Sequence, residues 1–210
     1  MFFHSGEDAM KLLVDIIKVD ASSRQMAALE RVDMEDFELV AYKTKKSYNE
    51  RGIFPAESFF EDGVWSLKQY YTTAIFDPYN LHAVSDNLDR FWHEHVIDTA
   101  RYSLLCSDIE GFMHHDPLDR TDLSKVSAVA QVYKYTRKVL VKIHGENNLS
   151  EDFFPARPEM DILVCRHDVE PYSATWDDAF PIDKDIIKIK HKYGNSAKVS
   201  SIKSQLVKRK

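Results

Sequence analysis

The feature that most constrains the fold is a long run of apolar residues at helical spacing in residues 123–145, LSKVSAVAQVYKYTRKVLVKIHG. Its apolar side chains recur every three or four residues, the period of an α-helix that buries one face. Gly145 stands after the last of them, where a C-terminal cap belongs. Four further segments carry the same pattern: residues 7–19, 33–52, 64–76 and 86–107. The chain is therefore predicted to be mainly α, a compact bundle of about five helices.

Polar residues mark the expected ends of these helices. Asp33 and Ser85 each stand where an N-cap belongs, directly before a periodic segment. Asp77-Pro78 stops a helix, because the residue before a proline is displaced from the helical conformation. Gly111 breaks the helix that precedes it and is expected to start a short turn that carries His114 and His115.

The pattern changes after Gly145. Three prolines interrupt the chain, and the alternating run Met160–Cys165 fits one strand. The segment IIKIKHK, in which Ile187 and Ile189 alternate with lysines, fits a partner strand. We expect three parts: a helical domain at residues 1–157, an irregular arm at 158–192 with at most one or two short strands, and a basic, mobile tail at 193–210.

Composition excludes several classes of protein. Apolar residues make up 44% of the chain and charged residues 30%, the balance of a soluble globular protein. No apolar run reaches the roughly 18 residues of a membrane span, so no membrane contact is expected. Acidic residues occupy the place of a signal peptide's apolar region, which predicts a cytoplasmic protein. Cys106 and Cys165 are too few for a disulfide framework, and Cys106 is expected to be a small buried hydrophobe.

Charge is unevenly distributed along the chain. The net charge is −6, yet residues 183–210 carry nine Lys/Arg against two Asp, a net +7, which leaves −13 on the rest. Such an asymmetry is typical of a tail that engages an acidic partner or nucleic acid. The segment 198–210 is the candidate, and its lack of aromatic residues predicts binding without sequence specificity. An ordinary mobile tail explains the same residues.

Four of the nine histidines fall within residues 89–117, DRFWHEHVIDTARYSLLCSDIEGFMHHDP. If residues 86–107 form one helix, its apolar residues centre on an axis about 340° from Asp89, at about 100° per residue. His93 and Asp89 then face the core one turn apart, and His95 lies at the boundary. The two histidines of the His-x-His pair are therefore predicted to have different roles.

A buried carboxylate at Asp89 needs a partner, because desolvating it costs several kcal/mol. Three interpretations are open: a polar pair with His93 that holds the packing, a non-metal acid/base pair, or a divalent metal site, with Zn or Fe as the ion. For the metal, the ligands would be Asp89, His93 and either His114 or His115, with His95 as a weaker candidate. His114 and His115 would have to travel about three helical turns, roughly 16 Å, to reach His93. Capping or tying their turn is the other interpretation of those two residues.

These residues also resemble a known family. The matching run is Leu88-Asp89-x-x-Trp92-His93-x-His95-x-x-Asp98-Thr99-x-x-Tyr102-x-x-x-Cys106, followed by Gly111-Phe112-Met113-His114-His115-x-Pro117. It resembles the glycine-rich domain-containing protein-like family of plants and bacteria. The looser matches are LKQYYTTAIF upstream and, downstream, Tyr133-x-x-Thr136 with Gly145 and Phe154-Pro155, where Phe154 replaces the usual Trp. The resemblance covers residues 65–157, and implies a small helical domain in which Trp-His-x-His and His-His are paired features. It implies no reaction.

The sequence thus supports functions of different classes. The first is a helical protein with a buried polar or metal site formed by Asp and His; if it is an enzyme, the ion would act as a Lewis acid or redox centre. The second is a non-enzymatic adaptor that uses the basic tail. The third is a structural or regulatory domain whose acidic body binds another protein. Phosphate-binding glycine loops, nucleophile elbows and Cys-x-x-Cys motifs are absent from the sequence.

Overall fold

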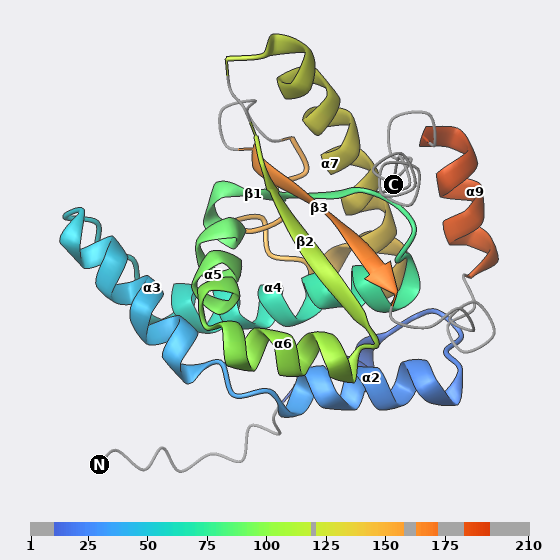
Figure 1. Ribbon diagram of the computed structural model, residues 1–210, viewed down its shortest axis with the longest axis horizontal. Coiled ribbons are helices and arrows are strands. Elements are labelled where there is room, and N and C mark those ends of the chain that lie inside the picture. Colours follow the sequence, from blue (N-terminus) through green and yellow to red (C-terminus); the bar gives the residue numbers. More distant parts are fainter. Residues whose placement is uncertain (1–10, 119–120, 158–162, 172–182, 194–210) are drawn as a thin grey trace, which may run out of the picture.

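The computed structural model describes residues 11–118, 121–157, 163–171 and 183–193. These residues form eight α-helices, a short 3₁₀ helix and three strands (Figure 1). The helices are α1 (Leu13–Ile16), α2 (Ser23–Met34), α3 (Glu38–Glu50), α4 (Glu57–Phe76), α5 (Asp86–Ile97), α6 (Thr99–Asp108), α7 (Leu123–His144) and α9 (Lys184–Tyr193), and the 3₁₀ helix is η1 (Glu146–Asn148). The strands are β1 (His82–Ser85), β2 (Gly111–Pro117) and β3 (Leu163–Pro171). The prediction of a mainly α protein is confirmed.

The three strands form one antiparallel sheet in the order β1-β3-β2. The central strand, β3, comes last in the chain, and β1 and β2 each pair only with it in this sheet. Figure 1 shows the sheet crossing the middle of the molecule, with the helices around it. Of these three strands the sequence predicted only β3, because β1 is four residues long and both partners of β3 are distant in sequence.

The core lies where α4 meets its neighbours. From Gln69 to Pro78 every residue is buried, so α4 is surrounded on all sides in its second half. Trp92 of α5 and Tyr135 of α7 are both fully buried against this part of the molecule. Helix α7 matches the predicted segment, and Gly145 follows it with φ of 83°, a left-handed conformation that glycine adopts without strain. Ser85 caps α5, and Asp77 follows the last residue of α4, both as predicted.

Helix α2 was not expected, and its presence changes the role of Asp33. That residue lies in the last turn of α2 and is not an N-cap; α3 begins only at Glu38. The Asp33 carboxylate instead accepts hydrogen bonds from the backbone N–H of Leu13, at 2.9 Å, and of Val14, at 3.4 Å. Asp33 therefore satisfies the open N-terminus of α1 from a neighbouring helix.

The helix expected at residues 86–107 is two helices. The chain leaves the helical conformation at Asp98, whose φ and ψ are −82° and 71°, and α6 starts at the next residue. The expected turn at His114 and His115 is also wrong, because both residues lie in β2. An extended chain covers about 3.3 Å per residue, more than twice the rise of a helix. Strand β2 therefore places His114 and His115 far back along α5.

The expected C-terminal arm contributes the strand β3 and the helix α9. The predicted strand at Met160–Cys165 is present from Leu163, and residues 158–162 lie outside the described residues. The predicted partner strand is wrong, because residues 184–193 form a helix. Ile186 is buried and Ile189 packs against the core, a spacing of three that suits a helix. The tail at 198–210 lies outside the described residues, so its predicted interaction with an acidic partner or nucleic acid remains a prediction.

Two smaller expectations concern the membrane and the cysteines. In the described ranges, no helix combines the length and the apolar character that crossing a membrane requires. Cys106 is a free thiol with no exposed surface, as expected of a small buried hydrophobe. Burial raises the pKa of this thiol, which keeps it protonated and unreactive.

Candidate functional site

The five residues expected at the site come from two elements, α5 and β2. Helix α5 supplies Asp89, His93 and His95, and β2 supplies His114 and His115. The two elements are joined through α6, whose Tyr102 hydroxyl donates a 2.5 Å hydrogen bond to the backbone oxygen of Met113 in β2. This bond ties β2 to the helical layer beneath it.

The predicted orientations of the two α5 histidines are reversed. His95 is buried, with 1% of its surface exposed, and His93 is exposed. The error came from using residues beyond Asp98 to define the apolar face, although they belong to α6. Within α5 alone, the four buried residues centre about 250° from Asp89, a quarter turn from the expected axis. Those four are Leu88, Phe91, Trp92 and His95.

His95 occupies an aromatic pocket in the core. Its Nδ1 lies 2.7 Å from the hydroxyl of Tyr71, and its ring meets Phe37 edge-on at 5.0 Å between centroids. Burial lowers the pKa of His95 to about 4, so the ring is neutral at physiological pH. Its role is structural packing, and the structure places it apart from Asp89.

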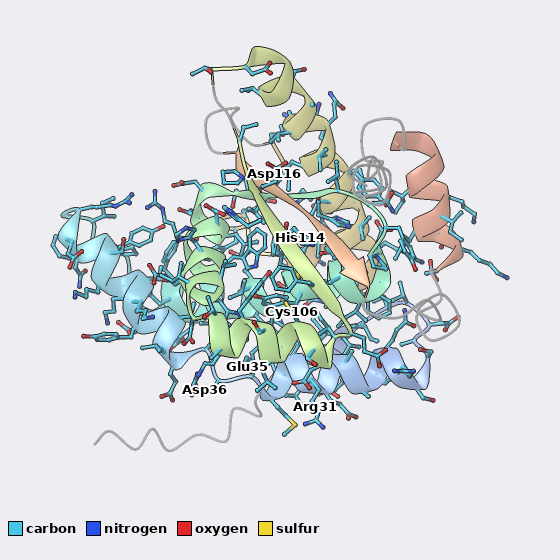
Figure 2. All side chains as sticks on the ribbon, in the orientation of Figure 1. Arg31, Glu35, Asp36, Cys106, His114 and Asp116 are labelled. Carbon is cyan, nitrogen blue, oxygen red and sulfur yellow. The ribbon has the colours of Figure 1, made fainter. Side chains whose placement is uncertain are left out.

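Strand β2 turns its two histidines to opposite faces, since successive side chains alternate across a strand. His114 packs on Phe112, two residues earlier on the same face, with 5.0 Å between the ring centroids. His114 and Asp116 are labelled on β2 in Figure 2. His115 points the other way and rests on the indole of Trp92, at 5.1 Å. Only His115 therefore faces α5.

Asp89, His93 and His115 come together at the surface between α5 and β2. His115 Nε2 lies 3.4 Å from Asp89 Oδ1, and the His115 ring is 5.8 Å from the His93 ring between centroids. The Asp89 and His115 side chains are 20% and 18% exposed. The three residues form an accessible group with a buried tryptophan behind it. The expected convergence of Asp89 with a returning histidine is thus present, with His115 as the partner and His114 excluded.

This group is not a ready-made metal centre. Among the described residues, no three His, Cys, Asp or Glu side chains are arranged to hold one ion as they stand. What the group does provide is one carboxylate and two imidazoles within reach of solvent. Those groups bind protons, divalent metals or polar ligands.

A cleft of about 390 Å³ adjoins the group between α3 and α5. Asp89 and His93 form part of its wall, and the remaining lining residues are Thr44, Ser47, Arg51, Asp86, Arg90 and Glu94. Its volume lies in the range of small-molecule sites. A ligand in this cleft would contact the same carboxylate that His115 approaches from the other side.

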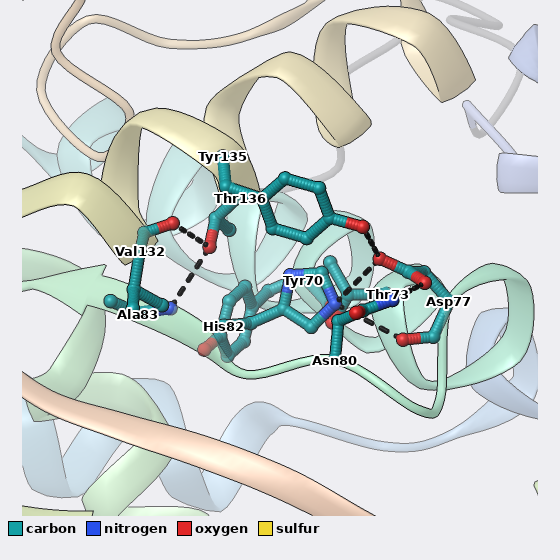
Figure 3. Close-up of polar contacts among 9 residues, drawn as sticks. All are labelled: Tyr70, Thr73, Asp77, Asn80, His82, Ala83, Val132, Tyr135 and Thr136. Atoms are coloured by element: carbon teal, nitrogen blue, oxygen red, sulfur yellow. Dashed lines mark hydrogen bonds and ion pairs between the residues drawn. The ribbon is translucent and has the colours of Figure 1, made fainter. Parts of the chain in front are cut away.

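A second polar group, which the sequence did not reveal, lies inside the molecule between α4, β1 and α7 (Figure 3). Asp77 accepts hydrogen bonds from the hydroxyl of Tyr135 and the side-chain amide of Asn80. His82 Nε2 lies 3.3 Å from the same carboxyl group, and its ring stacks on Tyr135 at 5.6 Å. Asp77, Asn80, His82 and Tyr135 all have no exposed surface. Burial, and then the neighbouring Asp77, raise the pKa of the Tyr135 phenol.

The downstream residues of the family resemblance make hydrogen bonds that join separate parts of the fold. Thr136 accepts a 2.9 Å hydrogen bond from the backbone N–H of Ala83, which fastens β1 to α7. The Tyr133 hydroxyl donates to the backbone oxygen of Pro155 at 3.1 Å. These residues hold the α7 side of the fold together and do not reach Asp89.

No protein-family model matches the chain, and neither a curated protein nor a solved structure matches it. The resemblance over residues 65–157 to the glycine-rich domain-containing protein-like family therefore remains a prediction from the motif.

Proposed function

We propose that the protein depends on a divalent metal ion, which Asp89, His93 and His115 bind at the edge of the α3–α5 cleft. The observation that carries this proposal is the 3.4 Å separation between His115 Nε2 and Asp89 Oδ1.

The separation suits two ligands of one ion better than a strong hydrogen bond. Charge-assisted N–H···O bonds are usually about 2.7–2.9 Å long, so 3.4 Å is a weak one. Zinc binds imidazole nitrogen and carboxylate oxygen at about 2.0–2.1 Å, and two such ligands at a tetrahedral angle stand about 3.3 Å apart. The Asp89 and His115 atoms are therefore spaced as the edge of a metal tetrahedron.

His93 is the third ligand in this proposal, and it must reorient. It lies one helical turn after Asp89 on the same face of α5. Its ring is 5.8 Å from that of His115, whereas two imidazoles on one zinc ion have centroids about 5 Å apart by the same bond lengths. Because His93 is exposed, a change of side-chain rotamer meets little resistance.

The ligand set favours a reactive ion over a purely structural one. Structural zinc sites are closed by four protein ligands, whereas catalytic sites use three and leave a position open. Two imidazoles with one carboxylate are also the ligands of non-haem Fe(II) enzymes. The open position would face the α3–α5 cleft, because Asp89 and His93 both line it. A bound ion there would polarise a ligand oxygen as a Lewis acid.

The test is metal binding by protein purified without a histidine tag. Metal content is measured by mass spectrometry, and Zn²⁺ and Fe²⁺ affinities by competition with a chromophoric chelator, the iron under nitrogen. We expect one ion per chain, and a loss of about 100-fold or more in affinity for His115→Ala and for His93→Ala. His114→Ala is the matched control, because it removes a histidine from the other face of β2.

Two outcomes would overturn the proposal. One is wild-type protein that takes up neither ion above the level of the double variant His93→Ala/His115→Ala. The other is binding that His114→Ala weakens as much as His115→Ala does, since that would place the ion elsewhere. X-ray absorption on the zinc form adds an independent readout, with two nitrogen-donor imidazoles expected in the ion's shell.

A further inference from the structure

The α3 wall of the cleft carries donors that the metal proposal does not use. Thr44 and Ser47 lie three residues apart in the second half of α3, and Arg51 is the C-cap residue that follows it; all three line the cleft opposite α5. Figure 1 shows α3 beside α5, and the Tyr48 hydroxyl holds the two together with a 2.9 Å bond to Asn87. These three residues form the donor wall of the cleft.

Thr44 is the unusual member of this wall. Its side chain is 1% exposed, and among the described residues its Oγ1 has no hydrogen-bond partner. A helical threonine commonly turns its hydroxyl back to a carbonyl one turn earlier. A buried hydroxyl without a partner is costly, so each such group calls for an explanation. A ligand at the base of the cleft would supply the missing bond.

Arg51 adds a cation that is not already committed. The other arginine of the cleft, Arg90, is held by Asp86 through two contacts of 3.0 and 2.6 Å and lies over the ring of Tyr48. Arg51 is exposed, and in the part of the chain that the structure describes it makes no ion pair. A guanidinium beside two hydroxyls is the donor set that recognises a carboxylate or phosphate.

From this arrangement we infer that the cleft binds a small molecule through an oxyanion, a carboxylate or a phosphate, seated on Thr44, Ser47 and Arg51. The far end of that molecule lies at Asp89 and His93 on the opposite wall. This names the substrate class of the proposed metal site, and it rests on that proposal only for the reactive end. The oxyanion seat itself consists of α3 residues that bind no metal.

The charges on the two walls of the cleft determine the orientation of the ligand. The α5 wall carries three carboxylates, those of Asp86, Asp89 and Glu94, against the single arginine Arg90. An oxyanion is repelled by that wall and attracted to Arg51 across the cleft. The ligand therefore enters with its anionic group against α3 and its other functional group toward the three site residues.

The experiment uses metal-stripped, ¹⁵N-labelled full-length protein in chelator-free buffer, titrated with succinate or with inorganic phosphate at fixed ionic strength. We expect saturable shifts of the backbone amides of residues 44–51 and of Arg51 Nε with one of the two probes, which tells carboxylate from phosphate. Arg51→Gln is expected to weaken that binding about tenfold. Thr44→Val is expected to weaken it about fivefold while raising the unfolding midpoint in urea, because it removes a costly unpaired hydroxyl and keeps the shape.

Arg31→Gln is the matched control, since it removes an exposed arginine on α2, away from the cleft, and should bind as wild type does. Absence of saturable shifts with both probes would overturn the inference. So would shifts that Arg51→Gln and Thr44→Val leave intact, or that Arg31→Gln abolishes equally. Because metal is absent throughout, failure here leaves the metal proposal standing, and a failed metal assay leaves this result valid.

Discussion

Two parts of the molecule combine aspartate with histidine, one in the buried core and the other at the surface. Between α4 and α7, Asp77, His82 and Tyr135 form a group with no exposed surface. Between α5 and β2, Asp89 and His115 form a pair about one fifth exposed beside a buried tryptophan. In the closed group the carboxyl of Asp77 is filled by donors from two elements. In the open pair the Asp89 carboxylate lies 3.4 Å from His115 and lines a cleft.

The difference shows that an Asp–His pair is defined by its access more than by its composition. No side chain of the closed group has exposed surface, so a ligand has no route to it. The open pair is partly exposed and has a cleft beside it. The comparison predicts that stability depends on the first group and ligand binding on the second.

The largest expected effect is on stability at the closed group. Asp77→Ala leaves the Tyr135 hydroxyl and the Asn80 side-chain amide without their buried acceptor, and should lower the free energy of unfolding by about 3–5 kcal/mol. Urea denaturation followed by circular dichroism measures this. Asp89→Ala is the paired variant, expected to cost less than about 1 kcal/mol. Equal losses at the two positions would remove the distinction between the groups.

A buried histidine on the same α4–α7 interface predicts how stability depends on pH. Burial lowers the pKa of His144 from 6.5 to about 3, and its Nε2 lies 3.0 Å from the Thr72 hydroxyl. Between these two pKa values, His144 is protonated in the unfolded chain but neutral in the folded one. The free energy of unfolding therefore falls as the pH drops below 6.5 and levels off only near pH 3. At pH 5 this residue alone costs about 2 kcal/mol relative to pH 8.

His144→Gln removes that titration and isolates its contribution. The variant is expected to be less stable at pH 8, where the neutral ring packs well, yet to lose about 2 kcal/mol less than wild type between pH 8 and pH 5. Urea midpoints at the two pH values give the difference. An identical pH dependence of stability in both proteins would show that His144 has the same pKa in the folded and the unfolded chain.

The smallest expected effect sharpens the open side of the comparison. His93 is exposed, so His93→Ala should change the free energy of unfolding by less than about 0.5 kcal/mol in metal-free protein. The same variant should remove the extra stability that added Zn²⁺ confers on the wild type, because ligand binding stabilises only the folded state. Thermal melts with and without zinc measure both quantities. A zinc-dependent rise that persists in His93→Ala would assign the ion to other residues.

Much of the helical architecture follows from the sequence, because apolar periodicity and capping residues are local signals. Helix α7 and the end of α4 lie where the pattern placed them. Helix α2 also carries a local signal in the sequence, at its N-terminus. Ser22 and Gln25 form a reciprocal capping box, with the Gln25 N–H 3.2 Å from Ser22 Oγ and the Ser22 N–H 2.9 Å from Gln25 Oε1.

The candidate site could be predicted only in part. The sequence correctly brought Asp89 together with one of the two later histidines, but it oriented α5 wrongly. The break at Asp98 involves neither glycine nor proline, so no residue marked it. The strand β2 was hidden for another reason: its pairing with β3 depends on residues 48 to 60 positions away. Without that partner, Gly111–Pro117 looks like a turn.

The position of β3 in the sheet carries a consequence for how the chain is made. Strands β1 and β2 leave the ribosome well before residue 163, yet β3 is the only strand in this sheet that either of them pairs with. Until it arrives, both present unpaired backbone edges, which in other proteins invite aggregation. His115 is fixed on β2, so the site opposite Asp89 is completed only when this late strand is threaded between two older ones. We therefore expect Asp89 and His115 to come together only after the last quarter of the chain has been synthesised.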